Sequence, residues 1–290
     1  MRINRMIRLV TVLFACFIVV SVNAQFETIN TDSVKTMNGI TISPDYKKLY
    51  SSWIISNRQN HIGKWDTRIF EYHLVNGTYV LQGRINFSGP YIDYHPILSP
   101  DGKRMYFNSL RPITEDTATL KKNNIWYSDY VNGAWTEPRL VPDINTDAYE
   151  SYPSVTHSGN LYFISDRPGG RGGDVYRASF KDGKYTDIKN MESVNTDLGE
   201  NDICVDPYER FMLISVFNKA TNQITMYVSY QENGTWTKPE TVKAFENEDK
   251  SVWILNPALT PDGKYFLYEH RSRIKRLPIE MVIDMKRIQQ

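Results

Sequence analysis

The chain has 290 residues, of which 41% are hydrophobic and 13% aromatic. Three of its 34 basic residues lie in the first 24 positions, so residues 25–290 carry 31 basic and 33 acidic side chains. A nearly neutral chain has no global field to attract nucleic acid or an anionic membrane, so neither partner is expected. The aromatic content favours strands.

The first 24 residues have the pattern of an export signal. Three arginines precede an apolar run over residues 9–22, and Ala24 is the small residue at the expected cleavage site. The run is shorter than the roughly 20 residues of a spanning helix. Cys16 offers lipidation as an alternative, which the sequence disfavours because the apolar run continues past it. We expect residues 1–24 to be removed and the mature chain, without a transmembrane segment, to be periplasmic or secreted.

A short hairpin then recurs four times along the chain. Each copy is an aromatic and β-branched strand, Asn-Gly or Asp-Gly, one residue, and then Tyr or Trp. The glycines are Gly77, Gly133, Gly183 and Gly234, and the aromatics are Tyr79, Trp135, Tyr185 and Trp236. Asn-Gly and Asp-Gly suit the positive φ angles of a type I′ turn. Recurrence every 50 to 56 residues indicates one supersecondary unit used repeatedly.

A second hairpin opens each unit. It is a strand, a Ser-Pro-Asp-Gly turn and a more apolar strand, with the turn marked by Pro44, Pro100, Pro207 and Pro261 and by Ser158 in the third unit. Two hairpins give four antiparallel strands per unit, which is the blade of a β-propeller. The sequence therefore predicts an all-β fold, with residues 25–290 forming one propeller domain of five blades. Six blades, with one degenerate, is the alternative.

The fifth unit stops early. It offers strands at 258–260, 265–268 and 279–284, and the chain then ends without a fourth. A strand-like segment without a partner lies at residues 26–37. We therefore expect the N-terminal segment to complete the last blade and close the ring, which leaves no exposed edge.

The repeat resembles that of TolB-type, WD40-like propellers, called PD40 repeats. The resemblance rests on Ser-Pro-Asp-Gly-Lys before an apolar strand and, in units two and three, on Asn-Ile-Trp or Asp-Val-Tyr, Gly-x-Trp or Gly-x-Tyr, and Ile- or Val-Asn-Thr-Asp. It covers most of residues 40–290, and the fuller pattern resembles secreted PD40 proteins common in Bacteroidetes. It implies the propeller fold, and it assigns no activity, because that family includes binding modules and many members without an assigned role. Unit four departs from the pattern, because Asp206-Pro-Tyr-Glu lacks the glycine.

Two recurrent sets of polar residues are candidates for a site. Acids precede the first strand of three units, and arginines follow the second strand of three units. The candidate ligand-binding residues are Asp93, His95, Arg111, Glu150, Arg167, Glu200 and Arg271. If the first strands line the channel, these residues meet near one of its mouths. Arginine forks would bind a carboxylate or sulfate. The other interpretation is that the acids and arginines of neighbouring blades pair and hold the ring together, and the recurrence of these residues at repeat positions favours it.

Two functions remain open from the sequence. The favoured one is a non-catalytic module that binds a protein or a glycan. The other is a polysaccharide lyase or glycoside hydrolase, with Glu150, Glu200 and His270 as catalytic candidates, since glycosidases need two carboxylates about 5 to 9.5 Å apart. The five histidines form no zinc-binding pattern, so neither a metal nor a cofactor is predicted. Cys204, in an apolar strand, is expected to be a buried thiol. The sequence does not indicate the oligomeric state.

Overall fold

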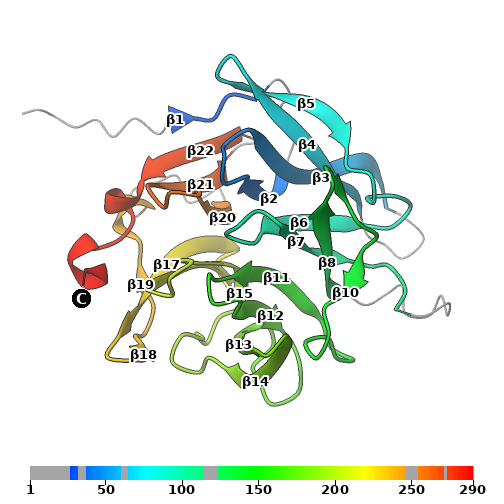
Figure 1. Ribbon diagram of the computed structural model, residues 1–290. Helices are drawn as coiled ribbons and strands as arrows, with labels where there is room; N and C mark the ends of the chain where they lie inside the picture. Colours follow the sequence, from blue (N-terminus) through cyan, green and yellow to red (C-terminus); the bar gives the residue numbers. More distant parts are fainter. Residues whose placement is uncertain are drawn as a thin grey trace, which may run out of the picture.

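The structure, a computed structural model, describes residues 27–31, 37–59, 65–113, 123–245, 254–270 and 273–289. Five antiparallel sheets are arranged around a central axis, as Figure 1 shows. The predicted all-β propeller of five blades is confirmed, and six blades is wrong, because the five sheets account for all paired strands of the described part. The predicted signal peptide, with Cys16, lies outside the described residues.

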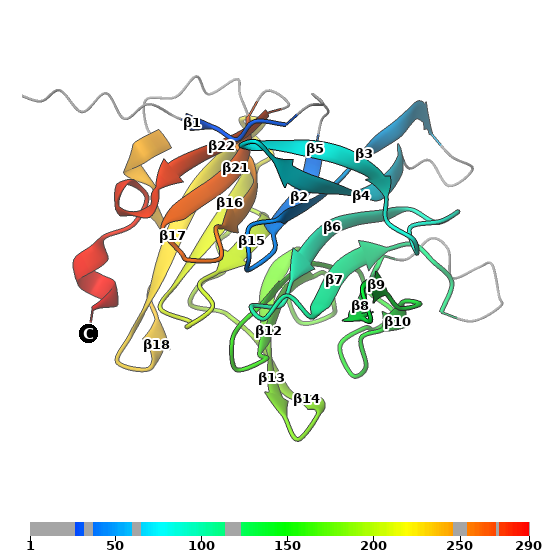
Figure 2. The same ribbon diagram turned by 45° about the horizontal axis from the view of Figure 1, so that its top comes forward.

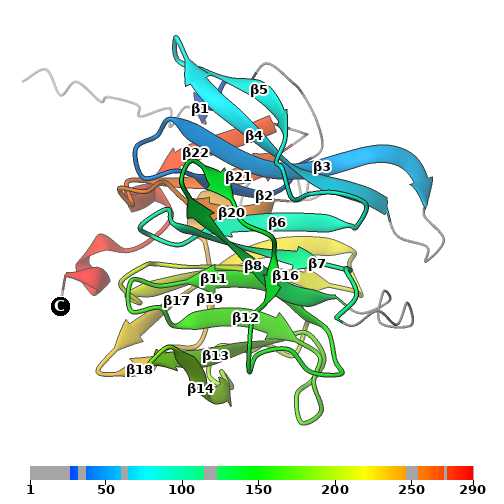
Figure 3. The same ribbon diagram turned by 45° about the vertical axis from the view of Figure 1, so that its right-hand side comes forward.

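Consecutive strands pair within each blade, and the first strands contact one another around the axis. Blade 1 comprises β2 (Met37–Ile42), β3 (Lys48–Gln59), β4 (Trp65–Val75) and β5 (Thr78–Arg84). Blade 2 comprises β6 (Asp93–Leu98), β7 (Arg104–Ser109), β8 (Asn124–Val131), β9 (Ala134–Trp135) and β10 (Arg139–Leu140). Blade 3 comprises β11 (Glu150–Val155), β12 (Leu161–Ser165), β13 (Asp174–Lys181) and β14 (Lys184–Asn190). The long β3–β4 hairpin extends past the other blades in Figure 3.

The last two blades follow the same order. Blade 4 comprises β15 (Glu200–Val205), β16 (Phe211–Asn218), β17 (Gln223–Glu232), β18 (Thr235–Trp236) and β19 (Glu240–Thr241), followed by the short helix η2 (Lys243–Phe245). Blade 5 comprises β20 (Leu255–Leu259), β21 (Tyr265–His270), β22 (Arg273–Pro278) and, from the other end of the chain, β1 (Glu27–Thr28).

The N-terminal strand closes the ring, as predicted. β1 pairs antiparallel with β22, with Glu27 opposite Arg276 and Thr28 opposite Lys275. The backbone N–H of Ile29 continues the ladder by donating to the carbonyl of Ile274 (3.0 Å). Figure 2 shows β1 lying along β22. The closing strand is shorter than the predicted segment, because Met37 already belongs to β2.

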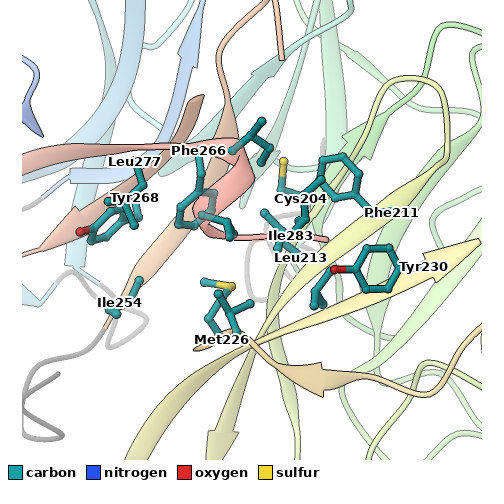
Figure 4. Close-up of a cluster of buried hydrophobic side chains, with 14 residues drawn as sticks. Cys204, Phe211, Leu213, Met226, Tyr230, Ile254, Phe266, Tyr268, Leu277 and Ile283 are labelled. Carbon is teal, nitrogen blue, oxygen red and sulfur yellow. The ribbon is translucent and has the colours of Figure 1, made fainter. Parts of the chain in front are cut away.

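The strand predicted at 279–284 is wrong. The third strand of blade 5 is β22, which pairs with β21 as far as Pro278, and two short 3₁₀ helices follow, η3 (Ile279–Met281) and η4 (Met285–Ile288). Ile279, Val282 and Ile283 are buried in a cluster between blades 4 and 5, part of which Figure 4 shows. A helical spacing is needed to bring these three side chains to one face. No helix within the described ranges is long and apolar enough to cross a membrane.

The recurrent hairpin aromatics join neighbouring blades. The turns have the predicted left-handed backbone, for example at Asn132 (φ 51°) and Gly133 (φ 86°). Three of these aromatics contact a tyrosine of the preceding blade. Trp135 packs edge-on against Tyr50 (ring centroids 5.7 Å apart), the Tyr185 hydroxyl lies 3.0 Å from that of Tyr106, and Trp236 packs edge-on against Tyr162 (6.0 Å). The aromatics therefore recur because each blade needs the same contact.

Candidate functional site

The first acid–arginine pair is buried inside blade 2. Asp93 begins β6 and is fully buried, and both of its carboxylate oxygens accept hydrogen bonds from Arg111 Nη2 (2.8 Å each). The hydroxyls of Ser109 (2.7 Å) and Ser88 (3.0 Å) donate to the same carboxylate. Ser109 Oγ also accepts from Arg111 Nε (3.0 Å), which turns the arginine back onto its own strand. This charge-assisted pair, with its additional serine partners, holds two parts of the blade together and has a structural role.

Blade 3 repeats this arrangement. Arg167 Nη2 donates to Glu150 Oε1 (3.2 Å), and Ser165 Oγ accepts from Arg167 Nε (3.1 Å). Thr146 donates to Glu150 through its backbone N–H (3.0 Å) and its hydroxyl (2.6 Å). The Asn-Thr-Asp motif therefore fixes the acid that follows it. Both pairs join two strands of the same blade and do not link neighbouring blades, because the serine orients the arginine inward.

The other predicted residues do not join these pairs. Glu200 begins β15, and the backbone N–H of Thr196 donates to its carboxylate (2.7 Å). Blade 4 has Asn218 where blades 2 and 3 have Arg111 and Arg167. Burial raises the pKa of Glu200. His270, at the end of β21, is partly exposed beside Tyr268. Arg271 lies outside the described residues. The described residues thus do not assemble the predicted ring of three acids and three arginines.

One residue from each blade instead meets at the axis. These residues lie five positions before the turn proline and are Gly39, His95, Tyr152, Asp202 and Asn256. In the third unit His157, and not the predicted Ser158, takes the place of the proline, because the N–H of Gly159 donates to Thr156 as that of Gly102 does to Ser99. A bulge in each first strand lies at or beside the axial position, and four of the five axial residues have a left-handed backbone. Only glycine fits at position 39, where a Cβ would lie 2.4 Å from His95 Cα. Its N–H donates to Asn256 Oδ1 (2.9 Å).

His95 and Asp202 face each other across this axial group. His95 Nε2 lies 3.4 Å from Asp202 Oδ1, and the ring packs edge-on against Tyr152 (5.0 Å). Neither ring nitrogen has a hydrogen-bond partner within the described part of the chain. Burial lowers the pKa of His95 to about 3 and raises that of Asp202 well above its ordinary value, so both groups are neutral over a wide pH range. His95 was a candidate from the sequence. Asp202 was missed, because its axial position becomes visible only when the five units are aligned by their turn prolines.

An apolar cavity opens at the other end of the first strands, where the Ser-Pro-Asp-Gly turns converge. It has a volume of about 100 Å³, and all five blades contribute to it. The prolines of four turns and His157 of the fifth surround it: Pro44, Pro100, Pro207 and Pro261. Asp93 and Pro100 lie at opposite ends of β6, so the cavity is on the face opposite to the predicted site.

A larger groove of about 330 Å³ continues from this cavity between blades 2 and 3. The two share Ser99, Pro100, Val155 and His157. The groove is also lined by Arg104, Asp129, Phe180 and Tyr185. Arg104 Nε donates to Asp129 Oδ1 (2.6 Å), and the other carboxylate oxygen, Asp129 Oδ2, accepts from Arg139 Nη2 (3.3 Å). Sequence reasoning missed these residues because each lies at an ordinary repeat position.

In the part of the chain that the structure describes, no group of three or more His, Cys, Asp or Glu side chains is placed to hold a metal ion. Cys204 lies at the wall of the axial cavity and is buried, and burial raises the pKa of its thiol. The groove between blades 2 and 3 presents charged side chains, Arg104 and Asp129, beside aromatic ones.

The sheet topology and the closed axis define the class of protein, a five-bladed β-propeller. Neither a protein-family model nor a curated protein sequence matches the chain.

Several solved structures are similar in fold. A gluconolactonase from Xanthomonas campestris is 12% identical with a TM-score of 0.48, over 87% of this chain and 88% of that chain. Hydrazine synthase from Kuenenia stuttgartiensis is 15% identical with a TM-score of 0.48, over 88% and 80%. The periplasmic gluconolactonase of Pseudomonas aeruginosa is 14% identical with a TM-score of 0.43, over 80% of this chain and 64% of that chain. At these values the similarity assigns no activity.

Proposed function

We propose that this protein is an exported propeller that acts as a non-catalytic binding module for a glycan, on the face formed by the Ser-Pro-Asp-Gly turns. The observation that carries the proposal is the distribution of polar groups. Asp93 and Glu150 are each held by an arginine of their own blade, whereas the turn face has a groove with tyrosine, phenylalanine and arginine side chains. A concave site with aromatic faces and a few polar groups is typical of ligand binding.

The export signal and the PD40 resemblance support the same proposal. Both indicate a chain that works outside the cytoplasm, where soluble and surface glycans are available. The resemblance adds no substrate, so the ligand has to be found by experiment.

A glycan array probed with residues 25–290, together with a polysaccharide-cleavage screen, tests this function. We expect binding to at least one glycan without release of reducing ends or unsaturated products. Array binding that survives bulky substitutions at the turn face, such as Pro100→Trp, would place the ligand elsewhere. Cleavage of the bound glycan would overturn the non-catalytic assignment.

One observation favours a second candidate, a glycan-cleaving enzyme. Glu200 is buried and has no arginine partner among the residues that the structure describes, and burial raises its pKa, as a general acid requires. A cleavage activity that Glu200→Gln abolishes without loss of folding would support this candidate.

A further inference from the structure

The five opening turns differ at one position that decides whether the gap to the preceding blade is filled. This position, two residues after the turn proline or its equivalent, has a positive φ in every blade, from 58° to 83°. Its occupants are Tyr46, Gly102, Gly159, Glu209 and Gly263. The backbone conformation at this position is therefore the same in all five blades, and only the side chain differs. Two of the five blades have a large side chain there despite the left-handed conformation.

Glu209 fills the gap between blades 3 and 4. Its carboxylate accepts hydrogen bonds from Tyr162 (2.6 Å), Arg177 (3.1 Å) and Asn160 (2.9 Å), all from blade 3. The tyrosine and asparagine lie on β12 and just before it, at the positions that Tyr106 and Arg104 occupy in blade 2. A carboxylate therefore sits against the recurrent tyrosine at this interface.

The gap between blades 1 and 2 also has a carboxylate in this place. Glu71 forms an ion pair with Lys48 (3.1 Å), which is the equivalent of Arg104. Glu71 also lies close enough to Tyr50, the equivalent of Tyr106, to raise the pKa of that hydroxyl further beyond the effect of burial. Gly102 leaves no opening here, because a Cβ would lie 2.7 Å from Pro44 Cδ.

The gap between blades 2 and 3 has the cation and the tyrosine without a carboxylate at this place. Gly159 occupies the position of Glu209, and the Tyr106 hydroxyl is paired with that of Tyr185 (3.0 Å). Among the described residues, Asp129 is the one carboxylate that Arg104 contacts, through Nε, and Asp129 is shared with Arg139. Two guanidinium groups thus face one carboxylate beside an open groove, and an anionic group from outside can take the missing place.

The groove also offers a flat apolar surface beside Arg104. Phe180 is 36% exposed and packs against Tyr185 (ring centroids 5.1 Å apart). Glycine at 159 permits this position of the phenylalanine, because a Cβ there would lie 2.7 Å from its ring. An aromatic face next to a guanidinium fits a ring-shaped ligand that carries a carboxylate.

We propose that the groove between blades 2 and 3 binds a sugar acid, such as a uronate residue of a glycan, with its carboxylate on Arg104 and its ring on Phe180. This assignment rests on the proposed glycan-binding function and names the class of glycan. An acidic peptide also carries a carboxylate but lacks the flat face of a pyranose ring. The aromatic surface therefore favours a sugar acid over a peptide as the ligand that supplies the carboxylate.

Calorimetric titration of residues 25–290 with glucuronate, galacturonate and short uronate oligomers tests the site, with glucose and galactose as neutral counterparts. We expect the uronates to bind and the neutral sugars not to bind over the same range. Arg104→Met keeps the aliphatic stem and is expected to weaken uronate binding about 10- to 100-fold, the range for hydrogen bonds to a charged group. Phe180→Ala, at a partly exposed site, tests the ring contact without risk to the core. Arg171→Met is the matched control, since Arg171 is an exposed arginine at the other end of blade 3.

Three kinds of result would overturn the assignment. The first is a loss of the expected selectivity, either as equal binding of uronates and neutral sugars or as uronate binding unchanged in Arg104→Met. The second is binding of an acidic peptide that depends on Arg104 while uronates do not bind, which would assign the carboxylate site to a peptide. The third is no binding of uronates or acidic peptides at millimolar concentration. If the glycan array still shows a neutral ligand in that third case, the proposed function stands and only the sugar acid is rejected.

Discussion

Replacing Arg111 by methionine tests whether the buried ion pair with Asp93 is structural. The Asp93 carboxylate has no exposed surface, and its other donors are the hydroxyls of Ser88 and Ser109. Methionine replaces much of the arginine stem but leaves a buried carboxylate with two neutral donors. Removing one partner of a buried pair costs about 3–5 kcal/mol. We expect the free energy of unfolding to fall by about this amount, a large share of the roughly 5–15 kcal/mol that stabilises a typical domain.

Urea denaturation of residues 25–290, followed by tryptophan fluorescence, measures this loss. Arg139→Met is the matched control, because Arg139 is 60% exposed and its pair with Asp129 is at the surface. Exposed pairs contribute about 0–1 kcal/mol. The double variant Asp93→Asn/Arg111→Met is expected to recover part of the loss, because no buried charge remains without a partner.

A loss of less than about 1 kcal/mol for Arg111→Met, equal to that of the control, would refute this reasoning. The carboxylate would then be solvated or uncharged in the folded protein. The pair would in that case be available for binding, which is one of the two interpretations that the sequence left open.

Trp135→Ala is expected to lower the free energy of unfolding by about 3–5 kcal/mol in urea denaturation, because the buried indole packs on Tyr50 of the preceding blade; an unchanged midpoint would contradict this. Between about pH 4 and 6.5, unfolding lets His95 take up a proton and Asp202 release one, so their effects on the pH dependence of stability cancel. In Asp202→Asn only the histidine effect remains, so the free energy of unfolding is expected to fall by about 1.4 kcal/mol for each pH unit of acidification in this range. Parallel pH profiles of stability for the variant and the unchanged protein would exclude this coupling. Cys204 is expected to react with a thiol reagent in denaturant and not in the native state, where fast labelling would disprove its burial.

The fold could be predicted because its determinants are local. Asn-Gly and Ser-Pro-Asp-Gly each set a tight turn from two to four residues, and counting these turns gives the strands and the blades. The segment 279–284 failed for the opposite reason. A six-residue segment with four apolar residues fits a strand or a helical turn equally, and burial of Ile279 and Ile283 between blades 4 and 5 decided the outcome.

The candidate site could be predicted only in part. The sequence brought Asp93 and Arg111 to one end of the blade, but the direction of the arginine depends on the Ser109 hydroxyl, which no spacing reveals. Asp202 and Arg104 were missed because each looks ordinary in its own strand. Aligning the units by their turn prolines exposes the axial position of Asp202, so the information was present as a difference between repeats.

Differences between aligned positions carry the functional signal in this ring, since every blade must meet the same structural demands. At the axis, the differing residues contact one another, so packing explains them. At the turn position, Tyr46 and Glu209 fill the gaps beside them. A second groove, of about 410 Å³ and lined in part by C-terminal residues, lies beside Gly263. Gly159 leaves a groove with Arg104 at its wall. Arg104 and Arg139 share the single carboxylate of Asp129 beside this groove, so a ligand that supplies a second carboxylate would balance their charge.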